Sequence, residues 1–114
     1  MSAGKYRLSN LTVLIDYNKH QSYGPTFDVL DLEPLADKWK AFGFAVKEVD
    51  GHDVGQLKEV LSQTPFERGK PSLIICHTVK GKGLACAENN LHWHHKNKLT
   101  VEEAQLLYHA LEVY

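Results

Sequence analysis

Three short apolar segments, separated by stretches with helical spacing, constrain the fold of this chain more than any other feature of its sequence. They run from Leu11 to Asp16, from Phe44 to Asp50 and from Ser72 to His77. The first and third are continuous apolar runs, which are typical of strands covered on both faces in a parallel sheet. Turn residues or helix ends flank each segment, so all three are predicted to be buried strands.

A helical pattern lies between the first two strands. Apolar side chains recur there at intervals of three and four residues, at Leu32, Leu35, Trp39 and Phe42. Gly43 follows at the point where a helix end favours a residue with positive φ. The pattern therefore predicts an amphipathic helix that ends at this glycine.

Two more helices are expected further along the chain. Asp53 precedes an apolar stripe from Val54 to Leu61 and is predicted to cap that helix. Thr100 and Glu103 form a capping-box pattern at the start of a final helix. Strands that alternate with helices imply right-handed βαβ units, so the expected fold is α/β: a three-layer parallel sheet with flanking helices, as one domain over residues 1–114. Three strands make about half of a usual doubly wound sheet, so an edge or a face should lie uncovered.

Composition and charge narrow the classes of partner. The 114 residues carry 13 basic and 14 acidic side chains with no basic stripe, so nucleic acid is not an expected partner. The apolar runs are far shorter than the ~20 residues that cross a bilayer, and no apolar leader follows Met1, so neither a membrane span nor a signal peptide is expected. Cys76 is expected to be a buried free thiol and Cys86 a loop residue, which favours a reducing, cytoplasmic location.

A polar stretch from Asp16 to Gln21 follows the first strand. Ligands bind beyond the carboxyl ends of strands in open parallel sheets, and the amide oxygen of Asn18 is a hard donor suited to Mg²⁺ or Ca²⁺. An ordinary Asx-turn at the end of the strand explains the same residue. Both interpretations remain open from this segment alone.

The segment Val49–Asp53 ends the second strand, and most of it has a structural explanation. Gly51 permits a sharp turn, and Asp53 can cap the next helix. His52 has no structural explanation in the sequence.

The long loop after the third strand carries the remaining chemistry. Lys80–Gly83 reads Lys-Gly-Lys-Gly and offers flexible backbone N–H groups with positive charge, which suits a phosphate-bearing ligand. Its spacing fits neither a Walker loop nor a dinucleotide fingerprint. His92, His94 and His95 suggest zinc as a weaker alternative, because no Cys or acidic ligand stands at metal-site spacing.

Taken together and in order, these segments resemble the transketolase family, most closely the N-terminal half-subunit of bacterial split transketolases. The matching segments are Asn10–Val13, Asp16–Asn18, Leu32–Gly43, Val49–Asp53, Lys80–Gly83 and Trp93–His94. The resemblance covers nearly the whole chain. It implies the C-terminal portion of a thiamine-diphosphate-binding domain, and therefore a partial thiamine-diphosphate-binding fold.

The resemblance also implies roles for individual residues. Asn18 matches the family's metal-ligating Asn, and His20 matches the next metal contact, made through its backbone carbonyl. Gln21 belongs to the same cofactor-binding segment. His94 matches a catalytic His near the diphosphate and the reacting carbon, where it can donate to a diphosphate oxygen and to developing charge on the sugar.

This sequence departs from the family pattern at several points. His77 stands where some relatives have Lys, and His95 stands where many have Gly. The Gly-Asp-Gly-Glu segment that opens the family's metal motif, and that supplies its principal metal ligand, does not occur here. The chain is therefore expected to bind the cofactor incompletely by itself and to be inactive alone.

The expected function is that of a transketolase-like subunit or fragment, a transferase that uses thiamine diphosphate and Mg²⁺ (or Ca²⁺). With its partners it would move a two-carbon ketol unit between sugar phosphates, as in pentose phosphate metabolism. The expected partners are the remaining thiamine-diphosphate-domain segment and a pyrimidine-domain subunit, or a second copy of the chain. The alternatives are a non-catalytic remnant of the fold that acts as a binding or structural module, and a small enzyme built on the His-rich loop.

Overall fold

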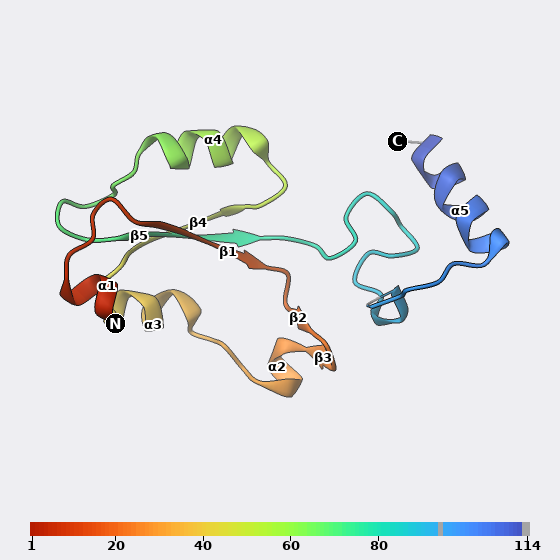
Figure 1. Ribbon diagram of the computed structural model, residues 1–114, viewed down its shortest axis with the longest axis horizontal. Helices are drawn as coiled ribbons and strands as arrows, with labels where there is room; N and C mark the ends of the chain where they lie inside the picture. Colours follow the sequence, from red (N-terminus) through yellow and green to blue (C-terminus); the bar gives the residue numbers. More distant parts are fainter. Residues whose placement is uncertain (94, 113–114) are drawn as a thin grey trace. The chain divides into compact units, whose positions relative to one another are not determined.

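A parallel sheet organises the first part of the molecule. The computed structural model describes residues 1–93 and 95–112. Strands β1 (Thr12–Tyr17), β4 (Ala45–Asp50) and β5 (Ser72–His77) form a three-stranded parallel sheet in the order β1-β5-β4 (Figure 1). All three predicted strands, and their parallel pairing, are confirmed.

Strand β5 forms the centre of the sheet and of the core. Leu73 and Ile74 are fully buried and Ile75 is nearly so. On one face of the sheet, Leu73 and Ile75 pack with Tyr17 and Phe44. On the other face, the buried side chains that pack together are those of Ile74, Cys76 and Val60. Burial of this apolar area is the main source of the fold's stability.

Helices cover both faces of the sheet. Helices α1 (Ser2–Lys5) and α3 (Leu35–Ala41) lie on one side and α4 (Val54–Ser62) on the other (Figure 1). Asp53 caps α4 as predicted, since its carboxylate accepts a hydrogen bond of 3.0 Å from the backbone N–H of Gln56. This bond and one from the Gln56 side chain lower the pKa of the Asp53 carboxyl. Gly43 has a φ of 88°, as its place after α3 requires.

Strand β1 corrects one sequence-based expectation. Its continuous apolar run suggested cover on both faces, but it is an edge strand, and the side chain of Leu14 is 49% exposed. The expectation of full cover holds for β5 alone. The uncovered face of β1 agrees with the prediction that a three-stranded sheet leaves apolar surface accessible.

The chain divides into two compact units. Unit 1 comprises Met1–Tyr17 and Asp31–Thr78, and unit 2 comprises Asn18–Leu30 and Val79–Tyr114. The described elements of unit 2 are β2 (His20–Gln21), β3 (Gly24–Pro25), α2 (Thr26–Val29), the 3₁₀ turn η1 (Leu91–Trp93) and α5 (Val101–Glu112). The capping box of α5 is confirmed, because Thr100 and Glu103 bond reciprocally through N–H groups and side-chain oxygens at 3.0 and 3.2 Å. No helix in the described ranges is long and apolar enough to cross a bilayer.

The two cysteines are predicted to react at different rates. Burial raises the pKa of the Cys76 thiol, and the negative charge of Asp16 raises it further. Cys86 is half-buried, and both thiols are free. Iodoacetamide at neutral pH should therefore alkylate Cys86 first, because the thiolate is the nucleophile and Cys76 is both less accessible and less ionised. Peptide mass spectrometry over time measures both rates, and denaturant should make them equal. Equal rates in the native chain would contradict the buried position of Cys76.

Candidate functional site

Polar side chains gather where the three strands of unit 1 end. The register aligns Tyr17, His77 and Asp50 across β1, β5 and β4. Gly51 fits closely beyond them, since a Cβ on it would lie 2.5 Å from the Thr78 side chain, and its N–H donates to the His77 carbonyl at 2.8 Å. The turn predicted at Gly51 is therefore required by close packing against the end of β5.

Tyr17 ties this edge to helix α3. Its hydroxyl donates to one Glu33 oxygen at 2.7 Å, and the other Glu33 oxygen accepts the N–H of Leu35 at 2.8 Å, at the start of α3. Tyr17 is 6% exposed, so this hydrogen bond satisfies a hydroxyl in the core. The residue immediately before Asn18 is therefore held by packing and by a hydrogen bond.

His77 extends this contact to β4. Its ring centroid lies 5.8 Å from that of Tyr17, and its Nε2 is 2.7 Å from a carboxylate oxygen of Glu48. On the neighbouring strand end, the Thr78 hydroxyl donates to Asp16. His52, which the sequence left without an explanation, donates its backbone N–H to the Asp50 carboxylate at 2.8 Å. His77 thus has a structural contact here, with Glu48 on the neighbouring strand.

In unit 2, a short hairpin presents the predicted metal-binding residues. Strands β2 and β3 pair His20 with Pro25 and Gln21 with Gly24. The side-chain oxygen of Asn18 accepts the backbone N–H of His20 at 2.9 Å, so Asn18 does form an Asx-turn. The His20 ring is used locally as well, since its Nδ1 lies 3.0 Å from the Asn18 carbonyl. The His20 ring is therefore turned toward the backbone of Asn18, two residues earlier.

The tip of this hairpin contacts the His-rich loop. The Ser22 hydroxyl lies 3.2 Å from Nε2 of His95. His95 has a φ of 60°, in the left-handed region that favours glycine. The structure thus brings Asn18, His20 and Gln21 into one hairpin whose tip bonds His95. His94 lies outside the described residues.

The Lys-Gly-Lys-Gly segment is folded back on its own loop. Gly81 has a φ of 79°, and a Cβ on it would lie 2.5 Å from the Ala87 carbonyl oxygen. The Lys80 carbonyl accepts the N–H of Asn89 at 2.9 Å, which closes the loop. The glycine at 81 is therefore required by a backbone crossing as well as by its φ.

The Glu88 carboxylate contacts groups of this segment that were expected to bind a phosphate. One of its carboxylate oxygens accepts the Gly83 N–H at 3.1 Å and lies 3.8 Å from the Lys82 ammonium. Lys80 and Gly81 instead line a small cavity of about 180 Å³, whose other walls are Ala87, Asn90 and Trp93. Within this segment, Lys80 and Gly81 are thus the residues that line a cavity, and the Gly83 N–H is bonded to Glu88.

No cluster of three or more His, Cys, Asp or Glu side chains that could hold a metal occurs within residues 1–93 and 95–112. The Asn18 amide oxygen already accepts one hydrogen bond and retains a second lone pair. That oxygen and a neighbouring carbonyl fit a hard cation such as Mg²⁺, which prefers oxygen ligands, but they make up only part of the roughly six it needs. The donor chemistry at Asn18 is thus compatible with a hard cation, and the described residues provide only part of a coordination sphere.

Comparison with known proteins identifies the family of this chain. Residues 1–113 match the model for the transketolase thiamine-diphosphate-binding domain, so the chain belongs to the transketolase family. It is 44% identical over 102 residues to the 6-deoxy-6-sulfo-D-fructose transketolase subunit SqwG of Clostridium sp. strain MSTE9, covering 90% of this chain and 37% of that protein. It is 38% identical over 95 residues to an apulose-4-phosphate transketolase subunit of Phocaeicola vulgatus, covering 83% of this chain and 34% of that protein.

The chain thus spans about a third of the length of these curated relatives. A solved transketolase from Pichia stipitis superposes with a TM-score of 0.80 at 22% identity, over 97% of this chain and 16% of that one. This likeness confirms the predicted α/β fold.

Sequence reasoning missed three groups that shape the site. Glu88 was not singled out, although a carboxylate shortly after a lysine- and glycine-rich segment is a reasonable signal for an internal ion pair. Ser22 and Glu33 had no detectable signal, because their partners His95 and Tyr17 are distant in the sequence. All three hold loops in place through hydrogen bonds.

His95→Gly is predicted to leave the loop folded. Glycine removes the cost of a left-handed backbone but loses the Ser22 contact, so the free energy of unfolding should change by less than about 1 kcal/mol. Gly81→Ala is the contrasting variant, because its Cβ would clash with the Ala87 carbonyl. Hydrogen exchange at the Asn89 amide, which bonds to Lys80, should accelerate in Gly81→Ala alone. Faster exchange in His95→Gly would show that the imidazole holds the loop.

Proposed function

We propose that this chain supplies one part of a thiamine-diphosphate and Mg²⁺ site and contributes to transfer of a two-carbon ketol unit between sugar phosphates. The observation that carries the proposal is the segment Asn18–Gln21, which directly follows strand β1 and leads into the β2–β3 hairpin, in a chain of the transketolase family. Relatives named as transketolase subunits for 6-deoxy-6-sulfo-D-fructose and apulose 4-phosphate support a subunit-like role. The particular sugar phosphates, the pentose phosphate context and a cytoplasmic location stay predictions.

In this proposal Asn18 and the His20 carbonyl each give one oxygen to Mg²⁺. The proposal is supported by the Asx-turn, in which the Asn18 amide oxygen accepts the His20 N–H, and by the left-handed backbone of Lys19 between them, with a φ of 66°. Gln21 extends the cofactor-binding segment. The other metal oxygens come from the cofactor and from the remaining segment of the thiamine-diphosphate domain.

Thiamine diphosphate, when bound, supplies the nucleophilic carbon that takes up the two-carbon unit. The residues of this chain are proposed to orient the cofactor and to stabilise the negative charge that develops on the sugar. His94 is proposed to donate a hydrogen bond to a diphosphate oxygen and to the oxygen that gains negative charge on the sugar. Lys80 offers a positive charge at the cavity that it lines with Gly81 and Trp93.

The partner proposal rests on exposed apolar surface. Leu14 on β1 and several apolar side chains of α5 are exposed, and exposed apolar surface is typical of interaction sites. The exposed α5 side chains are Val101, Leu106, Tyr108 and Leu111. We propose that the remaining thiamine-diphosphate-domain segment, a pyrimidine-domain subunit or a second copy covers these surfaces.

The isolated chain is predicted to bind thiamine diphosphate and Mg²⁺ weakly or not at all. Two protein oxygens are too few to hold a hard cation that requires about six. Isothermal titration calorimetry with the cofactor and Mg²⁺ together should show no saturation below about 1 mM, which corresponds to about 4 kcal/mol of binding free energy. Micromolar affinity would imply that the chain holds a self-sufficient site.

In a complemented complex with transketolase activity, His94→Ala is predicted to lower kcat/KM by about 10²-fold or more, the scale for loss of an electrostatic donor at a reacting centre. His92→Ala is the matched control, because His92 is exposed and its backbone N–H, rather than its ring, bonds to Asn90 at 3.0 Å. Steady-state kinetics measures kcat/KM of both variants, and circular dichroism checks that both are folded. Equal losses in both variants would favour the zinc alternative, and no activity in any complemented complex would favour a non-catalytic binding module.

A further inference from the structure

Both arginines of this chain line a single pocket, although they are far apart in the sequence. Arg7 and Arg68 are the only arginines among the 114 residues. They enclose a cavity of about 350 Å³ in unit 1, together with Lys70 and the glycines at positions 4, 43 and 69. We call this cavity the arginine pocket.

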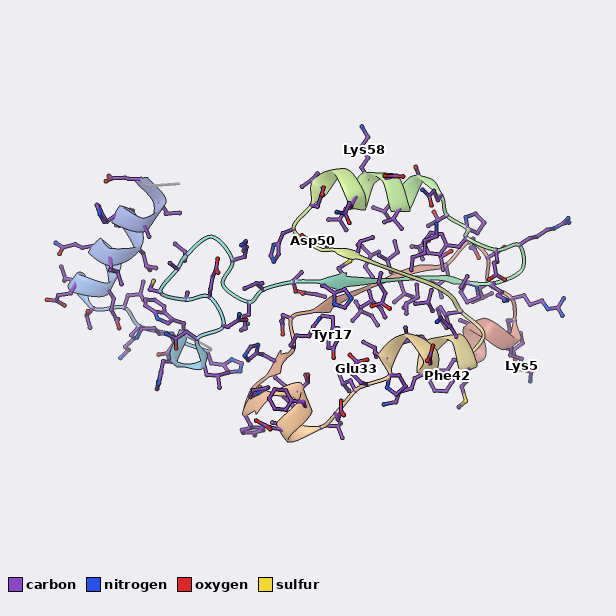
Figure 2. The ribbon with its side chains drawn as sticks, turned by 180° about the vertical axis from the view of Figure 1, so that it is seen from behind. Lys5, Tyr17, Glu33, Phe42, Asp50 and Lys58 are labelled. Atoms are coloured by element: carbon purple, nitrogen blue, oxygen red, sulfur yellow. The ribbon has the colours of Figure 1, made fainter. Side chains whose placement is uncertain are left out.

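The arginine pocket lies at the amino end of the sheet. Gly43 comes just before β4, and Lys70 comes just before β5. Figure 2 shows Lys5 and Phe42, the chain neighbours of Gly4 and Gly43, at the end of the sheet opposite to Tyr17 and Asp50. The pocket is therefore separate, within unit 1, from the polar carboxyl ends of the strands.

Three glycines line the pocket and contribute backbone to its walls in place of side chains. A Cβ on Gly4 would lie 2.1 Å from the Phe42 carbonyl oxygen, so the backbone of α1 touches the turn after α3. At Gly69, the site of the missing Cβ is 3.9 Å from Cδ of Arg7, which places the Arg7 side chain over the bare backbone of Gly69. A ligand in this pocket thus meets guanidinium groups and exposed peptide backbone.

The charge of the pocket is opposite to that of the chain. All charged residues that line it are basic, whereas the whole chain has a formal net charge of −1. The positive charge of Lys70 is neutralised by an ion pair with Glu67, with 2.5 Å between the ammonium nitrogen and a carboxylate oxygen. In the part of the chain that the structure describes, no carboxylate forms an ion pair with either guanidinium. Two arginines are thus available to an anion.

The backbone at Arg7 gives an independent indication. Arg7 follows α1 with a φ of 52°, and its N–H donates to the Gly4 carbonyl at 3.1 Å. Glycine is the residue that this left-handed position favours at a helix end. The backbone conformation at this position therefore favours glycine over arginine, whereas binding of an anion favours arginine.

We propose that the arginine pocket binds a phosphate monoester. A planar guanidinium donates two parallel hydrogen bonds to the oxygens of a phosphate. Two guanidinium groups together match the double negative charge of a phosphate monoester better than the single charge of a carboxylate ligand. The volume lies within the range of small-molecule sites, roughly 300–1,000 Å³, so an organic group has room beside the phosphate. This proposal is independent of the hairpin and His94 in unit 2.

Titration of the ¹⁵N-labelled chain with glycerol phosphate, at constant ionic strength, tests the proposal by NMR. The amides of Gly4, Gly43 and Gly69 should shift together and saturate with a Kd of about 1 mM or lower. Arg68→Gln should weaken this binding about tenfold or more, whereas Lys58→Gln should not, because Lys58 projects from α4 away from the sheet (Figure 2).

Arg7→Gly separates binding from folding. It should weaken glycerol phosphate binding about tenfold or more while it maintains or raises the melting temperature, because glycine suits the φ of 52°. A lower melting temperature with unchanged binding would show that Arg7 is structural, and the proposal would fail. It would also fail if the three glycine amides did not shift, or if Arg68→Gln and Lys58→Gln behaved alike. Acetate or an acidic peptide that bound as tightly as glycerol phosphate would overturn the assignment in favour of a carboxylate ligand.

Discussion

The pairing of β5 with strands on both sides is the interaction on which the rest of the structure depends. It buries Leu73 and Ile74 completely and gives each face of the sheet its core, with α3 on one side and α4 on the other. The same register aligns the ends of all three strands. Every loop with proposed chemistry therefore starts from a fixed edge, since Asn18 follows β1 directly and Thr78 follows β5.

Short-range hydrogen bonds then shape the loops themselves. The Asx-turn at Asn18 and the Glu88 contact with Gly83 are each made within a few residues of the backbone. Such contacts satisfy polar groups without a large core, which suits segments that bind ligands. They also limit what the loop after β5 offers, because the Glu88 carboxylate takes one of the N–H groups that a phosphate would need. The Asx-turn and the metal-ligand interpretation of Asn18, which the sequence left as alternatives, are compatible, because one lone pair of the amide oxygen serves each.

Features that depend on residues near one another in the sequence were predicted well. Three short apolar segments located the strands to within about a residue, and Asp53, Thr100 and Gly43 marked helix ends because capping chemistry is local. The hairpin of β2 and β3 was missed because two-residue strands carry no periodic signal. The edge position of β1 was missed because strand order depends on contacts distant in the sequence, and its apolar run is the same at an edge as in the centre. The arginine pocket has the same explanation, since only the fold brings Arg7 and Arg68 together.

The central claim is that the Asn18 hairpin forms part of a shared metal and cofactor site. A crystal structure of the complemented complex with thiamine diphosphate and Mg²⁺ tests it most directly. The account predicts that the Asn18 Oδ1 atom and the His20 carbonyl oxygen lie at roughly 2.0–2.1 Å from the metal, the usual Mg²⁺–oxygen distance. A metal ion fully coordinated by the cofactor, water and other segments, with Asn18 still engaged only in its turn, would contradict the account.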